Sequence, residues 1–197
     1  MILPHQWNPP PERIAIRCPS CGDQAVFVFG RFAYVDDRPQ RVVLARHRAC
    51  QTFPTTASGA KRHVVVHYPL LDPENEAKFT GKSLSEGGWE RDGAHPQMRE
   101  GTSLGSFACP VCLAEKAHVL TWPSDAFYVC TVRGVTLWAW TQEQCRILRT
   151  FVAALPGERE LAAGPLDLRH VPEDFLEGSA QAEVVKRLDR LLDAGDY

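Results

Sequence analysis

The stretch Cys18-Pro19-Ser20-Cys21-Gly22 largely decides the fold, because its pattern returns later as Cys109-Pro110-Val111-Cys112-Leu113. Two thiolates with two residues between them can reach one tetrahedral metal ion. The proline of each segment fixes one dihedral angle of the connecting turn. Glycine after the second cysteine permits a left-handed backbone, whereas the other segment has leucine there, so we expect its turn to be less secure. We call the two segments the first and the second knuckle.

The two knuckles together offer a complete set of ligands for one zinc ion. A closed shell of four thiolates is typical of a structural site and leaves no position for a catalytic water. The predicted ligands are Cys18, Cys21, Cys109 and Cys112. The 87 residues between the knuckles make an unusually long insertion. Such a length is tolerable, because the entropic cost of closing a loop grows only logarithmically.

Two other arrangements remain open at the level of sequence. In one, each knuckle binds its own zinc ion, the first with His47 and Cys50 and the second with His118 and Cys130. In the other, neither knuckle binds metal. Paired knuckles in a chain with reduced thiols usually share one ion, which favours the single four-cysteine site.

The composition is that of a globular protein with no membrane partner. Of 197 residues, 44% are hydrophobic and 23% are charged, with a formal net charge of −2. No apolar run approaches the roughly 18 residues of a membrane span, and the N-terminus lacks the pattern of a secretory signal. We therefore expect a cytoplasmic protein whose thiols stay reduced, and the odd count of seven cysteines also argues against a disulfide framework.

Valine-rich and aromatic runs predict strands, and periodic apolar residues predict helices nearer the C-terminus. Two runs around Arg133-Gly134 predict a hairpin. Thr141 and Gln144 have the spacing of a capping box at the start of a helix that Pro156-Gly157 ends. The other predicted elements are strands at residues 26–29, 32–35, 42–44 and 63–68 and a helix near residues 180–193.

These elements predict an α+β fold, with zinc-ribbon-type β hairpins, an antiparallel sheet, a long insertion and two C-terminal amphipathic helices. Residues 1–12 are predicted to form an extended, proline-rich arm, and residues 13–197 a single zinc-stabilised domain. Isolated apolar residues among glycine, serine, proline and charge make residues 69–107 a polar insertion, which we interpret as mobile unless a partner orders it.

The strongest charge feature is a group of four arginines, Arg38, Arg41, Arg46 and Arg48. A basic strand of this kind can contact nucleic-acid phosphates, and the nearby aromatic residues Phe27, Phe29, Phe32 and Tyr34 can stack on bases. The simpler interpretation is a solvated strand face for the arginines and a buried core for the aromatic side chains.

Three further patterns do not predict a catalytic or metal site. Cys130 and Cys145 fall in apolar patterns, and we expect them to be buried, inert thiols. Residues 101–105 match the letters of a nucleophile elbow, but no strand precedes them and no helix follows, so a flexible loop is predicted. His63 and His67 lie on a predicted strand, where they stand about 13 Å apart and cannot bind one ion.

Several blocks of the C-terminal half carry a resemblance: the second knuckle, His118-x-Leu120-x-Trp122-Pro123-x-Asp125-Ala126-x-Tyr128, Gly134-x-x-Leu137-Trp138-Ala139-Trp140, Leu168-x-x-Val171-Pro172-x-x-Phe175 and Val184-x-x-x-Leu188. They resemble a family of small, uncharacterised bacterial proteins with zinc-ribbon-like cysteine pairs. The resemblance covers about residues 105–192 and the first knuckle. It implies the fold and the zinc site, it implies no activity, and it places His118 near the zinc as a ligand or hydrogen-bond partner.

Together these features predict a non-enzymatic zinc-ribbon binding or adaptor protein in a bacterial cell. A closed metal site stiffens a small β unit, which then presents a surface to a protein partner or to nucleic acid. The net negative charge of the chain favours the protein partner. One alternative is a nucleic-acid-binding zinc ribbon that uses the basic strand Arg38–Arg48. The other is a zinc-dependent hydrolase with an open metal site. No small-molecule substrate is predicted.

Overall fold

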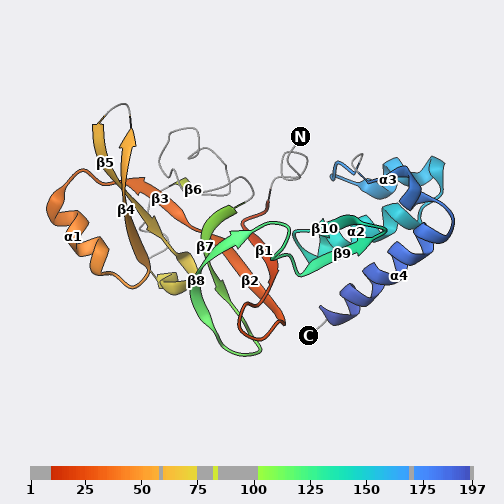
Figure 1. Cartoon of the computed structure of the whole chain (residues 1–197), viewed down its shortest axis with the longest axis horizontal. Helices are drawn as coiled ribbons and strands as arrows, with labels where there is room; N and C mark the ends of the chain where they lie inside the picture. Colours follow the sequence, from red (N-terminus) through yellow and green to blue (C-terminus); the bar gives the residue numbers. More distant parts are fainter. Residues whose placement is uncertain (1–9, 58–59, 75–81, 84–101, 169–170, 196–197) are drawn as a thin grey trace. The chain divides into compact units, whose positions relative to one another are not determined.

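The computed structural model describes residues 10–57, 60–74, 82–83, 102–168 and 171–195 (Figure 1). Its contacts divide the chain into two compact units. Unit 1 consists of Met1–Arg17 with Pro123–Tyr197, and unit 2 of Cys18–Trp122. The single domain predicted for residues 13–197 stays a prediction, because two compact units can still unfold as one.

Unit 2 is built on two antiparallel sheets. One contains, side by side, β2 (Gln24–Phe29), β7 (Thr102–Ala108) and β8 (Glu115–Thr121). The other has the order β4 (Cys50–Ala57), β5 (Ala60–His67), β3 (Arg31–Tyr34) and β6 (Lys82–Ser83). Gly30 separates β2 from β3, so consecutive strands enter different sheets. Its N–H donates to the carbonyl of Leu104 in β7 (2.9 Å).

Helix α1 (Arg38–Arg46) replaces the strand predicted for residues 42–44, so that prediction is wrong. Asp37 is the N-cap, and its carboxylate accepts a hydrogen bond from the Gln40 N–H (3.1 Å), while Pro39 lies in the first turn. Aspartate at the N-cap followed by proline is a signal for the start of a helix. Here it outweighs the β propensity of two consecutive valines.

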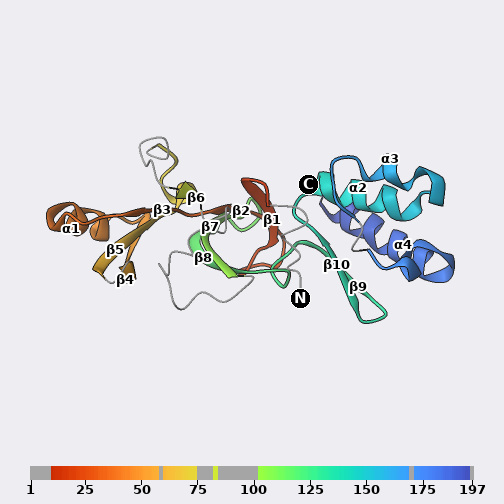
Figure 2. The same ribbon diagram turned by 90° about the horizontal axis from the view of Figure 1, so that it is seen from above.

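The basic strand predicted at Arg38–Arg48 is therefore wrong as well. Arg38, Arg41 and Arg46 lie on α1, and Arg48 follows its end. Both views of the ribbon show α1 beside β4 and β5 and away from β7 and β8 (Figures 1 and 2).

Part of the insertion predicted at residues 69–107 is regular structure. A 3-10 turn, η2 (Pro69–Leu71), is tied to the first sheet, because the Leu70 N–H donates to the Ser106 hydroxyl in β7 (3.2 Å). Since β7 begins at residue 102 and is the strand between β2 and β8, the flexible loop predicted for residues 101–105 is wrong from residue 102 onward. The remainder of the insertion (75–81 and 84–101) and residues 1–9 of the arm lie outside the described residues.

Unit 1 combines a hairpin with helices around a core of its own. Its elements are β1 (Arg13–Arg17), β9 (Tyr128–Val132), β10 (Val135–Ala139), α2 (Gln142–Ala153), η5 (Pro156–Glu158), α3 (Arg159–Ala163), η6 (Glu173–Leu176) and α4 (Gly178–Ala194). Leu148, Val152, Val184 and Leu188 from α2 and α4 pack in the core with the hairpin. The predicted α+β class and the two C-terminal amphipathic helices are confirmed.

Local signals in unit 1 were sufficient to predict the β9–β10 hairpin, α2 and α4, but β1, α3, η5 and η6 were not predicted. Arg133 (φ 50°) and Gly134 (φ 82°) form the two-residue connection of the β9–β10 hairpin. The Thr141 hydroxyl accepts from the Gln144 N–H (3.3 Å), as in a capping box, whereas the Gln144 side chain reaches one residue further back and accepts from the Trp140 N–H (3.1 Å). Among the described residues, none of the helices combines the length and the apolar character that crossing a membrane demands.

Candidate metal centre

Strand pairing brings the two knuckles together. The first knuckle leads into β2, and the second connects β7 to β8. Since β2 and β7 run antiparallel with Val26 opposite Ala108, the start of β2 lies beside the end of β7. The long gap between the knuckles in the sequence is therefore closed by adjacent strands of one sheet.

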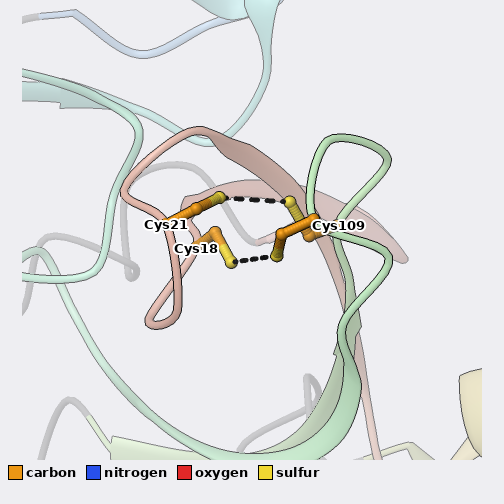
Figure 3. A group of neighbouring side chains, drawn as sticks. Cys18, Cys21 and Cys109 are labelled. Carbon is orange, nitrogen blue, oxygen red and sulfur yellow. Dashed lines mark hydrogen bonds between the residues drawn. The ribbon is translucent and has the colours of Figure 1, made fainter.

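The four sulfur atoms are arranged as a tetrahedral metal ion would hold them. The Sγ atoms of Cys18 and Cys112 lie 3.7 Å apart and those of Cys21 and Cys109 3.6 Å apart, and all four lie within 4.8 Å of one another. With metal–sulfur bonds of about 2.3 Å, the edge of a zinc tetrathiolate is about 3.8 Å. A disulfide needs about 2.05 Å, so all four cysteines are free thiols. Figure 3 shows that both short contacts cross from one knuckle to the other.

The two knuckles share one backbone conformation. The Cys18 N–H donates to the Asp23 carbonyl (2.7 Å), and the Cys109 N–H donates to the Ala114 carbonyl (3.0 Å). The residue after the second cysteine is left-handed in both, with φ 85° at Gly22 and 56° at Leu113. Leucine therefore occupies a conformation that suits glycine, in agreement with the less secure turn predicted for the second knuckle.

Backbone amides favour a thiolate at one position of the group. Burial opposes ionisation of Cys18, but the N–H groups of Cys21 and Ser20 point at its sulfur and lower the pKa of Cys18 to about 6. The Ser20 nitrogen lies 3.4 Å from that sulfur. At Cys112 the Ala114 N–H acts in the same direction, yet desolvation and the contact with Cys109 raise the pKa of the thiol. A bound cation such as zinc would displace the remaining protons.

Two of the alternative ligands, His118 and Cys130, are not part of this group. His118 lies on β8 with its ring edge-to-face against Phe27 and Phe107, with ring centroids 6.2 and 5.8 Å apart. Cys130 is buried in the core of unit 1, where desolvation raises the pKa of its thiol. A buried thiol of raised pKa is unreactive, as predicted for Cys130.

The other two alternatives, His47 and Cys50, lie near an aspartate instead. The Nε2 atoms of His47 and His67 lie 3.6 and 3.7 Å from the same Asp72 oxygen, and Cys50 is opposite His67 in the β4–β5 pair. Nδ1 of His47 accepts the Ala49 N–H (3.3 Å), so Nε2 of a neutral ring carries its proton and faces the carboxylate as a donor. Asp72 was not predicted as a site residue, and its only signal in the sequence is its place just after the turn that follows β5.

The four cysteines are the one group of three or more metal-ligating side chains in the described part of the chain whose ligand atoms lie this close together. Cys18 and Cys109 are buried, whereas Cys21 and Cys112 are exposed. The arrangement favours one shared ion over one ion per knuckle.

The predicted basic and aromatic residues separate into exposed and buried sets. Arg38, Arg46 and Arg48 are exposed, and the Arg41 guanidinium contacts the ring of His63 on β5 (Nη1 to Nε2, 3.0 Å). The phenylalanines of the predicted stacking surface (Phe27, Phe29 and Phe32) are buried.

Tyr34 does not supply an open stacking platform either. The Arg62 guanidinium lies over its ring, 4.5 Å from the centroid. Tyr34 is half-buried, and Arg62 occupies one face of its ring. The simpler interpretation as core is confirmed for the three phenylalanines.

A scan against protein-family models, a search of curated proteins and a search of solved structures each find no match to this chain. The resemblance to the bacterial family stays a prediction, and a function has to be argued from the site itself.

Proposed function

We propose that the chain is a non-enzymatic zinc-binding protein of the zinc-ribbon type, in which zinc holds the knuckles of unit 2 together and unit 2 presents a surface to a macromolecular partner. The observation that carries the proposal is the group of four sulfurs with contacts of 3.6 and 3.7 Å between the knuckles. Thiolates in tetrahedral array select zinc over harder cations, and four of them fill its shell. A filled shell supports a structural role.

The zinc-dependent hydrolase is the weaker candidate. Such an enzyme needs three protein ligands and one position for water. The described part of the chain places no histidine or carboxylate in the group, so an open position would require one of the four thiolates to leave. We further propose that the protein acts in the cytoplasm of a bacterial cell, where its thiols stay reduced, and that its partner is a protein or nucleic acid.

X-ray absorption at the zinc edge of the purified full-length chain tests the proposal. We expect one zinc per chain, bound by four sulfurs at about 2.3 Å. A shell of three sulfurs completed by nitrogen or oxygen would contradict the structural role and favour the hydrolase.

Serine variants identify the ligands in the same experiment. Cys18→Ser and Cys109→Ser should each lower the zinc content to near zero, because one ion needs both knuckles. Cys145→Ser is the matched control: that thiol is buried in unit 1, burial raises its pKa to about 12, and its loss should leave zinc unchanged. If Cys109→Ser kept a full equivalent while Cys18→Ser lost it, the shared site would be wrong.

A further inference from the structure

Helix α1 has a defined start but no fully buried residue. Asp37 caps it and Pro39 lies in its first turn, yet none of its residues is buried. Residues 38–48 contain four arginines and no acidic residue. Packing alone does not explain such an element, because most helices in proteins are stabilised by an apolar face. Its charge points instead to a polyanionic partner.

Three exposed residues form a stripe along α1. Arg38, Val42 and Arg46 are spaced by four, which places them on one side of the helix. Val42 is 46% exposed, and its neighbour Val43 is 69% exposed. The opposite side faces the rest of unit 2, since Leu44 is half-buried there. Over eight residues, a rise of 1.5 Å per residue separates Arg38 and Arg46 by about 12 Å.

The acidic residues beside α1 do not cancel this charge. Asp36 pairs with Arg62 (2.7 Å), and Asp37 is occupied as the N-cap. In the part of the chain that the structure describes, no ion pair joins Arg38 or Arg46 to another side chain. The guanidinium groups of the stripe are therefore available to an external anion.

We infer that α1 docks in the major groove of double-stranded DNA, with Arg38 and Arg46 on the phosphates that flank the groove and Val42 toward the bases. The B-DNA major groove is about 12 Å wide and admits a helix, whose diameter with side chains is about 10–12 Å. Because residues spaced by four are offset by about 40° around a helix, Arg38 and Arg46 project to opposite sides of Val42. An exposed valine in the groove can contact thymine methyl groups, as other small apolar side chains do.

Two other nucleic acids fit α1 less well. Single strands are held by exposed aromatic side chains, but Phe27, Phe29 and Phe32 are buried and Tyr34 is covered by Arg62. The major groove of an RNA duplex is too deep and narrow for side chains to read. The inference deepens the proposed function by naming the partner of unit 2.

Fluorescence anisotropy with a labelled 20-base-pair DNA duplex of mixed sequence tests the inference on the zinc-loaded, full-length chain. In about 50 mM salt we expect the duplex to bind more tightly than an RNA duplex or a single strand of the same sequence. Arg38→Gln with Arg46→Gln should weaken binding by about tenfold per arginine and lower the slope of log affinity against log salt by about 2.

The matched control replaces Arg146 and Arg190 of unit 1 by glutamine, which changes the net charge equally but leaves α1 intact. Its affinity and salt slope should equal those of the natural sequence. Equal weakening in both double variants, no duplex binding at about 0.1 mM protein, or equal binding of RNA or single strands would each overturn the inference. Zinc content is measured in every sample: if the natural sequence holds its zinc but does not bind the duplex, the role of α1 is refuted while the proposed zinc site stands.

Discussion

Leu113 shows how one residue limits the second knuckle. Its φ of 56° is left-handed and its side chain is 81% exposed, so it carries backbone strain without any gain from burial. Leu113→Gly removes about 1–2 kcal/mol of strain but adds about 0.5–1 kcal/mol of backbone entropy in the unfolded chain. We expect the free energy of unfolding of the zinc-loaded protein, measured in urea, to rise by about 0.5–1 kcal/mol.

A matched control separates relief of strain from the removal of an exposed leucine. Leu155 is 68% exposed, but its φ is −68°. Leu155→Gly should therefore lower the free energy of unfolding or leave it unchanged. If Leu113→Gly also lowered it, strain at the knuckle would not be the dominant effect.

At the scale of the element, β7 depends on having glycine at position 105. A Cβ atom there would collide with the Phe27 ring and the Val28 carbonyl oxygen of the paired strand β2. Phe27 is fully buried, so its ring has no open space into which to move. Gly105→Ala should reduce the free energy of unfolding by about 3 kcal/mol, the upper range for overpacking. Urea denaturation followed by circular dichroism measures this loss.

Gly157→Ala provides the comparison for that substitution. No atom lies within 4 Å of the Cβ that would be added at Gly157. Alanine there should have no effect or stabilise slightly, because it restricts the unfolded chain. Equal losses in the two variants would show that the close approach of β7 to β2 is unimportant.

Elements with strong local signals were predictable from sequence, and elements that depend on distant partners were not. The β9–β10 hairpin, α2 and α4 follow from turn, capping and periodicity. Strand β7 was missed, because its buried Ser103, Gly105 and Ser106 have no apolar pattern, and only pairing with β2 and β8 makes them strand. Helix α1 was not predicted, because Val42 and Val43 favour a strand while the helix depends on the cap at Asp37.

The candidate metal site was predictable because metal coordination restricts residue type and spacing more strongly than folding does. The Cys-x-x-Cys pattern specifies each pair of ligands. Each pair supplies only two of the four ligands that zinc needs, so two pairs imply one shared ion. The register that joins them, with Val26 opposite Ala108, was not predictable, since 87 residues separate the two knuckles. The approach of His47 and His67 to the same Asp72 carboxylate also depends on contacts between residues far apart in the sequence, which no local pattern predicts.

At the scale of the whole molecule, the two units draw on different sources of stability. The core that contains Cys145, Phe151, Phe175 and Leu188 comes entirely from unit 1. The four cysteines lie entirely in unit 2. A structural zinc ion contributes on the order of 10 kcal/mol, comparable with the net stability of a domain. The stability of unit 2 should therefore depend on zinc much more strongly than that of unit 1.

Hydrogen exchange with and without a zinc chelator measures this dependence separately in each unit. Removal of zinc leaves four thiols with no ion to hold the knuckles together, so amide protection should fall in β2, β7 and β8. Protection in α2 and α4 should persist, because their core contains no zinc ligand. The Cys18→Ser variant should reproduce this pattern without chelator, while Cys145→Ser should keep protection in β2 and β7. Simultaneous loss in both units would instead establish the single cooperative domain predicted for residues 13–197, since the stability of unit 1 would then depend on a metal ion that it does not bind.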